Sequence, residues 1–249
     1  MPELAGISAF WVYLSASPLL GLSMTLCAYL AAQRVFLWCG GSPLANPVAI
    51  SIGLVVLVLW LSGMSYGQYF SGAQFVHFLL GPATVALAVP LVRQLPRLRR
   101  AWLPLAAALL LGCVTAIVSA VAIAALLGAT PELGATLGPK SATSPIAMAV
   151  SQRLGGIPAL TAALVIGTGI FGAIVARYVF AALRIDSPAA RGFALGLAAH
   201  GVGTARAFQV SAEMGAFAGL AMGLNGAMTA LLAPWLVPLV LSLVQGRLA

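Results

Sequence analysis

Residues 137–150 read Leu-Gly-Pro-Lys-Ser-Ala-Thr-Ser-Pro-Ile-Ala-Met-Ala-Val, and they interrupt a chain that is otherwise almost entirely apolar. Gly138 and Pro139 cannot hold a straight helix through this point. The only lysine of the chain, Lys140, follows them, and it is close in sequence to the hydroxyls of Ser141, Thr143 and Ser144. A lysine with such neighbours is costly in lipid unless it faces protein, water or a ligand. The stretch therefore predicts a binding site built on interrupted helices.

The composition around this stretch is that of an integral membrane protein. Of 249 residues, 62% are hydrophobic and 6% are charged, and the mean hydropathy is +1.08. A soluble domain carries about 25% charged residues. The apolar runs reach roughly twenty residues and do not alternate with polar residues, which favours spanning helices over barrel strands. We expect a single transmembrane domain over residues 1–249, an all-α polytopic helix bundle with interrupted or re-entrant helices.

The apolar segments and their charged flanks predict a topology in the cell inner membrane. The segments cover residues 10–30, 48–64, 74–95, 102–127, 159–182 and 216–244, with an interfacial piece at 66–72 and a second interrupted piece at 193–208. The densest charge cluster, at residues 93–100, contains four arginines and predicts a cytoplasmic loop, which places the N-terminus outside. If residues 140–152 are re-entrant, Arg184 and Arg191 also lie inside; if that piece spans, they lie outside. The positive-inside rule favours re-entrance.

A weak internal similarity accompanies this topology. The tripeptide Leu-Gly-Pro occurs at residues 80–82, before the fourth segment, and again at 137–139, before the fifth. Ala-Ile-Val follows in both copies at the same offset, at residues 116–118 and 173–175. With a re-entrant second copy the two segments run in opposite directions, which is typical of the inverted repeats of transporters.

A second polar stretch lies in the interrupted piece at residues 193–208. It contains His200, Gly203, Thr204 and Arg206, and Glu213 follows it. Broken helix ends expose unpaired N–H groups and a positive dipole, and such ends bind anions such as carboxylates. We expect both stretches to line one aqueous cavity that holds an anionic substrate. The alternative is that Lys140 and Arg206 only extend toward the membrane interface. Glu213 is expected to pair with Arg206 or to carry a proton.

Other functional classes have little support in the sequence. Residues adjacent in sequence do not face one another on a helix, which weakens a Ser-Lys pair at Lys140 and Ser141. No Asp accompanies His200, and neither a nucleophile-elbow motif nor a zinc-protease motif is present. The three cysteines lack metal-ligand spacing. We therefore expect no enzyme activity, no metal and no cofactor, and we expect no nucleic-acid binding because no soluble basic face is visible.

The polar stretches and their flanks strongly resemble the signature of the LrgB/CidB family. The resemblance is carried by residues 139–149 (PKSATSPIAMA), 190–196 (ARGFALG) and 199–206 (AHGVGTAR), and it extends from about residue 43 to residue 238. Further matches are Asn46-Pro47, the pair Tyr66 and Tyr69, residues 82–88 and residues 213–217. Two departures are mild: Ala199 stands where the family usually has Ser, and Ser144 stands where a second Thr is usual.

The resemblance implies two functions. Bacterial members are described as antiholin-like regulators of murein hydrolase export and autolysis, and they are paired with a small LrgA/CidA-type membrane protein. A plastid member resembles a glycolate/glycerate translocator, and some bacterial members resemble pyruvate transporters. The helix breaks and two cationic stretches favour transport of a small 2-hydroxy or 2-oxo acid. The expected partners are that carboxylate, the LrgA/CidA-type protein and the lipid bilayer, and homo-oligomerisation is left open.

Overall fold

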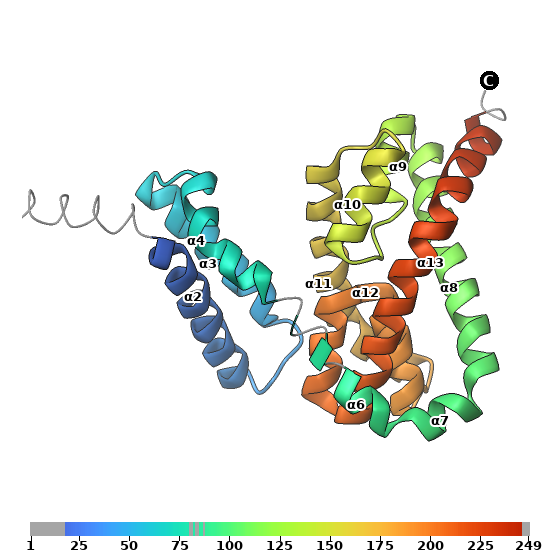
Figure 1. Ribbon diagram of the computed structural model, residues 1–249, viewed down its shortest axis with the longest axis horizontal. Helices are drawn as coiled ribbons and strands as arrows, with labels where there is room; N and C mark the ends of the chain where they lie inside the picture. The colour runs from blue at the N-terminus through green and yellow to red at the C-terminus, as the bar shows by residue number, and fades with distance from the viewer. Residues whose placement is uncertain (1–17, 80–81, 83–84, 87, 246–249) are drawn as a thin grey trace, which may run out of the picture. The chain divides into compact units, whose positions relative to one another are not determined.

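The computed structural model describes residues 18–79, 82, 85–86 and 88–245, and every regular element in this part of the chain is a helix (Figure 1). Within it, four helical stretches are long and apolar enough to cross a membrane: Leu19–Trp38, Trp102–Leu126, Pro158–Ala182 and Ala212–Val244. The prediction of an all-helical polytopic membrane protein is confirmed. The chain divides into two compact units, residues 1–86 and 87–249. That all residues form a single functional domain stays a prediction.

The first unit contains α2 (Pro18–Trp38), α3 (Pro47–Ser62) and α4 (Tyr66–Phe78). Helix α3 begins at Pro47 because the Asn46 side chain accepts hydrogen bonds from the N–H groups of Val48 and Ala49, at 2.9 and 3.2 Å. Asn46 is therefore the N-cap of α3, with Pro47 in its first turn.

Two boundaries in the first unit differ from the sequence prediction. Helix α2 continues to Trp38 instead of ending near residue 30, because no Gly or Pro interrupts it before the turn at Gly40 and Gly41. The expected interfacial piece and the start of the third segment form one helix, α4. It stays helical because it packs closely on α2, where a Cβ on Gly21 would lie 2.2 Å from the Tyr69 carbonyl oxygen. The rest of the third segment falls partly outside the described residues.

The second unit contains the polar stretches. Its helices are α6 (Ala88–Arg93), α7 (Leu95–Arg100), α8 (Trp102–Leu126), α9 (Pro131–Leu137), α10 (Ser144–Arg153), α11 (Pro158–Ala182), α12 (Pro188–Val210) and α13 (Ala212–Gln245). Helix α13 begins four residues before the expected 216 and continues through Pro234 and Pro238. Neighbouring helices and local adjustment allow proline inside membrane helices.

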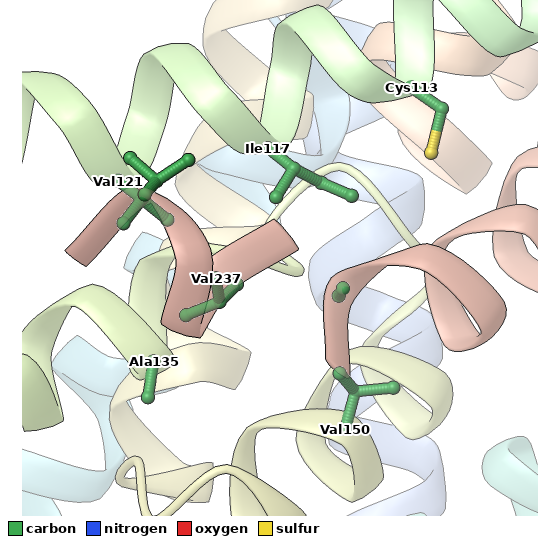
Figure 2. Packing of buried hydrophobic residues seen from close by; sticks show 8 residues of the cluster. Cys113, Ile117, Val121, Ala135, Val150 and Val237 are labelled. Atoms are coloured by element: carbon green, nitrogen blue, oxygen red, sulfur yellow. The ribbon is translucent and has the colours of Figure 1, made fainter. Parts of the chain in front are cut away.

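A buried apolar cluster joins α8, α9, α10 and α13 (Figure 2). Ile117 and Val121 of α8 lie against Val237 of α13, and all three are at most 1% exposed. Ala135 of α9 and Val150 of α10 complete the contact. In a bilayer such contacts stabilise by close packing, since lipid tails are as apolar as the side chains. The cluster holds the short helices α9 and α10 against the long helices α8 and α13. The first polar stretch lies between α9 and α10.

Helices α9 and α10 form a re-entrant hairpin. The hydroxyl of Thr136, in α9, accepts a hydrogen bond from the N–H of Ile157, at the start of α11, at 2.9 Å. The Thr161 hydroxyl of α11 lies 3.1 Å from the Thr136 carbonyl oxygen and 2.7 Å from the hydroxyl of Ser151, in α10. Both arms of the hairpin therefore meet the first turn of α11, and the chain leaves on the side where it entered. The open alternative of a spanning segment at residues 140–152 is wrong.

Helix α12 is also a hairpin, made of two helical arms. The backbone breaks at His200, with φ 40° and ψ −129°. A Cβ on Gly203 would lie 2.5 Å from the carbonyl oxygen of Leu195. In a continuous helix, residues eight apart are separated by about 12 Å along the axis. The second arm, after His200, therefore runs back along the first.

The first arm of α12 packs on α13 through two glycines four residues apart. A Cβ on Gly192 would lie 2.1 Å from the Met214 carbonyl oxygen, and one on Gly196 would lie 2.0 Å from that of Ala218. Small residues at this spacing let two membrane helices approach backbone to backbone. The α12–α13 contact is the most extensive between any two described helices.

The two hairpins enter the second unit from opposite ends. Arg97 of α7 pairs with Glu213, and Gly192 contacts Met214, so α7 and the open end of the α12 hairpin lie at the start of α13. We call this the arginine-rich end. The α9–α10 hairpin opens at the other end, where Gly134 meets Leu241 near the end of α13 (Figure 1). The inverted repeat expected from residues 80–82 and 137–139 is a different relation and stays a prediction, since residues 80 and 81 lie outside the described part of the chain.

Candidate functional site

The tips of the two hairpins meet at Asn225 of α13. Its side-chain amide donates to the carbonyl oxygen of Ser141, in the first tip, at 3.0 Å, and to that of Leu197, near the second tip, at 3.1 Å. Both partners are carbonyl oxygens, which fixes the orientation of the amide because only its nitrogen can donate. Asn225 is 1% exposed. It lies thirteen residues into α13, about 20 Å along the helix from its start, and so well inside the bilayer.

Val165 of α11 is a second meeting point. The imidazole Nε2 of His200 lies 2.8 Å from the Val165 carbonyl oxygen, so Nε2 carries the proton and donates it. Ala142, in the first tip, packs against the Val165 side chain. The imidazole has room because Gly169 lacks a side chain: a Cβ there would lie 2.6 Å from the ring. Val165 thus contacts both polar stretches, which are sixty residues apart. That they line one aqueous cavity stays a prediction.

Lys140 is half-buried at the first tip, where the chain turns through hydrogen bonds from Lys140 N–H to Leu137 and from Ala142 N–H to Pro139. Burial lowers the pKa of its ammonium group, which lies outside the four candidate spans. None of the acidic residues that the structure describes forms an ion pair with it. An anion beside Lys140 would stabilise the charged form and raise this pKa again.

The first turn of α10 faces the same tip. Thr143 is its N-cap residue by backbone conformation, yet the Thr143 side chain makes no capping hydrogen bond. Ser144 is the first helical residue, and Pro145, which has no N–H, follows. Ser144 and Thr143 are half-buried. A helix start that its own cap residue leaves unsatisfied offers N–H donors and a positive dipole to a ligand.

The second tip is more self-contained. The Thr204 hydroxyl donates to the carbonyl oxygen of His200 at 2.9 Å and also lies 3.8 Å from the sulfur of Met222. His200, Gly203 and Thr204 are all buried. Gly203 is required by the close return of the second arm, and Thr204 stabilises the turn. Contact of these residues with a substrate stays a prediction.

Arg206 and Glu213 lie apart from the tips. Arg206 lines a pocket with Arg177 and Arg191, and its guanidinium donates to Gln209 at 3.0 Å. Neither Lys140 nor His200 lines this pocket. Glu213 forms the expected ion pair, but with Arg97 at 2.7 Å, so the assignment of Arg206 as its partner is wrong. Glu213 lies just before the close α12–α13 contact and faces α7. The prediction chose Arg206 because it is near in sequence, and the sequence does not show that α7 packs beside the start of α13.

Two polar groups that hold the hairpins in place are absent from the sequence-based site. Asn225 resembles a default helix cap, since a single amide in an apolar segment carries no local signal for a bridging role. The triad of Thr136, Ser151 and Thr161 consists of hydroxyls in three different helices, each fully buried. Buried hydroxyls in membrane helices form hydrogen bonds with neighbouring helices. A hydroxyl residue inside an apolar segment is therefore the only sequence signal that could have indicated this triad.

Comparison with known proteins finds a family and several relatives that match most of the chain. A model of the LrgB-like family matches residues 25–239. A Bacillus subtilis (strain 168) protein, the uncharacterized YwbG, is 37% identical over 222 residues, which cover 88% of this chain and 97% of that protein. An uncharacterized protein of Haemophilus influenzae is 34% identical over 80% of this chain and 86% of its own length. The antiholin-like protein LrgB of Bacillus mycoides is 28% identical over 90% of this chain and 97% of its own length.

No solved structure matches the chain. The family model covers both polar stretches, the two hairpins and the bridging Asn225. The chain belongs to the LrgB-like family of membrane proteins.

Proposed function

We propose that this chain carries a small monocarboxylate, such as glycolate, glycerate or pyruvate, across the cell inner membrane. The observation that carries the proposal is Lys140: a half-buried ammonium at a re-entrant tip, without an acidic partner among the described residues. The carboxylate of the substrate would pair with this ammonium and with the N–H groups at the start of α10. The oxygen at C2 would bond to the hydroxyls of Ser141, Thr143 and Ser144.

The second hairpin supplies the rest of the proposed site. His200, Gly203 and Thr204 lie at its tip, on the other side of Asn225 from Ser141. Hairpins that enter from opposite ends and meet near mid-membrane support alternating access, because either hairpin can open while the other stays closed. No deep pair of carboxylates is available, so proton coupling, if present, would use His200 or Glu213.

The names of relatives favour a second function. Proteins of Bacillus mycoides and Bacillus cereus that are 27 to 28% identical are named antiholin-like protein LrgB, and none of these names mentions a transported substrate. In this reading the chain regulates murein hydrolase export and autolysis together with an LrgA-type membrane protein. A regulator without a substrate would not require a free ammonium at the hairpin tip, and the site geometry therefore favours transport.

Uptake of labelled glycolate, glycerate and pyruvate into proteoliposomes tests the proposal, with and without an LrgA-type partner. We expect Lys140→Ala to abolish uptake and to leave thermal stability in detergent unchanged, because the ammonium pairs with the ligand instead of the protein. Lys140→Arg should also abolish uptake, since the planar guanidinium group does not replace a compact ammonium group. Arg153→Ala, which removes an exposed charge at the end of α10, is the matched control and should keep uptake.

Wild-type uptake by Lys140→Ala would contradict the anion site. Absence of uptake by the wild-type chain, alone and with the partner, would favour the regulator.

A further inference from the structure

A pocket of about 380 Å³ lies at the arginine-rich end, between the last turns of α11 and both arms of the α12 hairpin. Its charged lining consists of Arg177, Arg191 and Arg206. Arg177 and Arg206 are twenty-nine residues apart, and the pocket exists only because α12 folds back on itself. It is separate from the hairpin tips, since none of the tip residues lines it.

Positive charge is concentrated in this pocket. Arg191 is the most constrained of the three: it donates to the carbonyl oxygen of Ile185, pairs with Asp186 at 3.0 Å and lies over the Phe180 ring. The Asp186 side chain is 90% exposed, so it neutralises little of the charge inside the pocket. Glu213, the other acidic residue at this end, is bound to Arg97.

The arginines also act on one another. Burial, and then the charge of Arg177, lower the pKa of Arg206, which lies outside the four candidate spans. Like charges that share a partly buried pocket are unfavourable unless an anion joins them. None of the described acidic residues forms an ion pair with Arg177. Among the described residues, the acidic side chains therefore leave Arg177 available to an anion.

The depth of the pocket indicates which anion fits. Arg177 is the twentieth residue of α11, and about twenty helical residues cross the hydrocarbon core of a bilayer. If α11 begins at one boundary of the core, Arg177 reaches the other boundary, where lipid phosphates lie. The remaining walls are apolar and include Phe180, Leu195 and Met214. Apolar side chains beside a set of guanidiniums match a lipid, whose apolar part adjoins its charged headgroup.

We propose that this pocket binds the phosphate of an anionic phospholipid headgroup. Guanidinium groups bind phosphate oxygens through paired, charge-assisted hydrogen bonds. Basic pockets between membrane helices on the cytoplasmic side are a known way of recognising such headgroups. The pocket contacts α11, both arms of α12 and Met214 of α13, so a bound lipid would fasten the second hairpin to the spanning helices.

The test uses the full-length protein, stripped of lipid in detergent, with added phosphatidylglycerol or phosphatidylcholine. Lipid retention is measured by native mass spectrometry and thermal stability by unfolding. We expect phosphatidylglycerol, but not phosphatidylcholine, to be retained and to raise the melting temperature. Arg177→Gln should weaken phosphatidylglycerol binding about tenfold or more, since a hydrogen bond to a charged group contributes this much. Arg177 is exposed and should tolerate the change without unfolding.

Two further variants and two competitors make the result decisive. Arg206→Gln should weaken binding similarly, whereas Arg184→Gln, an exposed arginine at the same end outside the pocket, should bind as wild type. Equal retention by all variants would overturn the proposal. Stabilisation by inorganic phosphate or glycolate that equals the effect of phosphatidylglycerol and disappears in Arg177→Gln would also overturn it, because the pocket would then take a free oxyanion.

Discussion

At the scale of single residues, Asn225 is the connection on which both hairpins depend. Asn225→Ala removes two hydrogen bonds and leaves the carbonyl oxygens of Ser141 and Leu197 buried without this donor. Each such loss destabilises by about 1–3 kcal/mol, so we expect a total of about 2–6 kcal/mol in thermal unfolding in detergent. Asn225→Asp should be at least as harmful at neutral pH, because a carboxylate accepts and cannot donate.

The matched control is Asn46→Ala, which removes a helix cap and should destabilise by about 1 kcal/mol. Wild-type stability of Asn225→Ala would show that neither carbonyl needs a donor.

The role of a residue could be predicted from the sequence where it depends on neighbouring residues, and could not where it depends on residues far away in the chain. Gly138 and Pro139 break a helix wherever they occur, so the first tip could be predicted. Thr204 and Gly203 belong to a motif whose composition indicates a turn. Asn225 and the partner of Glu213 depend on elements distant in sequence, and nothing in their neighbours encodes the contact.

At the scale of helices, the glycines of α12 determine how closely the hairpin packs on α13. A methyl group at Gly196 would lie 2.0 Å from the Ala218 carbonyl oxygen and 2.6 Å from its carbon. Backbone atoms cannot rotate away, so Gly196→Ala should separate the helices and destabilise the protein by about 1–3 kcal/mol. The measurement is thermal unfolding in detergent.

Gly167→Ala is the control for Gly196→Ala, because nothing lies within 4 Å of a Cβ at this position of α11. It should leave stability unchanged or raise it by up to about 1 kcal/mol, as expected for alanine in a helix interior. Similar melting temperatures for both variants would contradict the close α12–α13 contact.

Most helices could be predicted from the length of their apolar runs. Their predicted ends were wrong where packing against another helix keeps a segment helical through a glycine or proline. Helix α4 passes through Gly72 without a break because the glycine packs against α2. The first arm of α12 carries glycines at positions 192 and 196, and this spacing was a readable signal for close packing. Re-entrance at residues 140–152 was inferred only from arginine positions, since a short helix that spans and one that returns have the same composition.

At the scale of the whole second unit, most of the described arginines lie at one end of the helix bundle. Those of α7, the last turns of α11 and the open end of α12 gather near the start of α13, whereas Arg153 lies at the opposite end with the α9–α10 hairpin. Re-entrance of both hairpins produces this separation. A spanning segment in either place would have divided the arginines between the two sides.

This distribution predicts an orientation of the second unit, with the arginine-rich end in the cytoplasm. An external N-terminus stays a prediction from the sequence. The test introduces single cysteines into a variant in which Cys27, Cys39 and Cys113 are replaced by serine. Arg99→Cys and Arg153→Cys are both exposed and lie at opposite ends. An impermeant maleimide added to intact cells should modify the cysteine at position 153 and spare the one at position 99. After permeabilisation both should react, which shows that each thiol is accessible. Modification at position 99 in intact cells, with protection at 153, would reverse the orientation and place the lipid pocket and the open end of the second hairpin on the outer face.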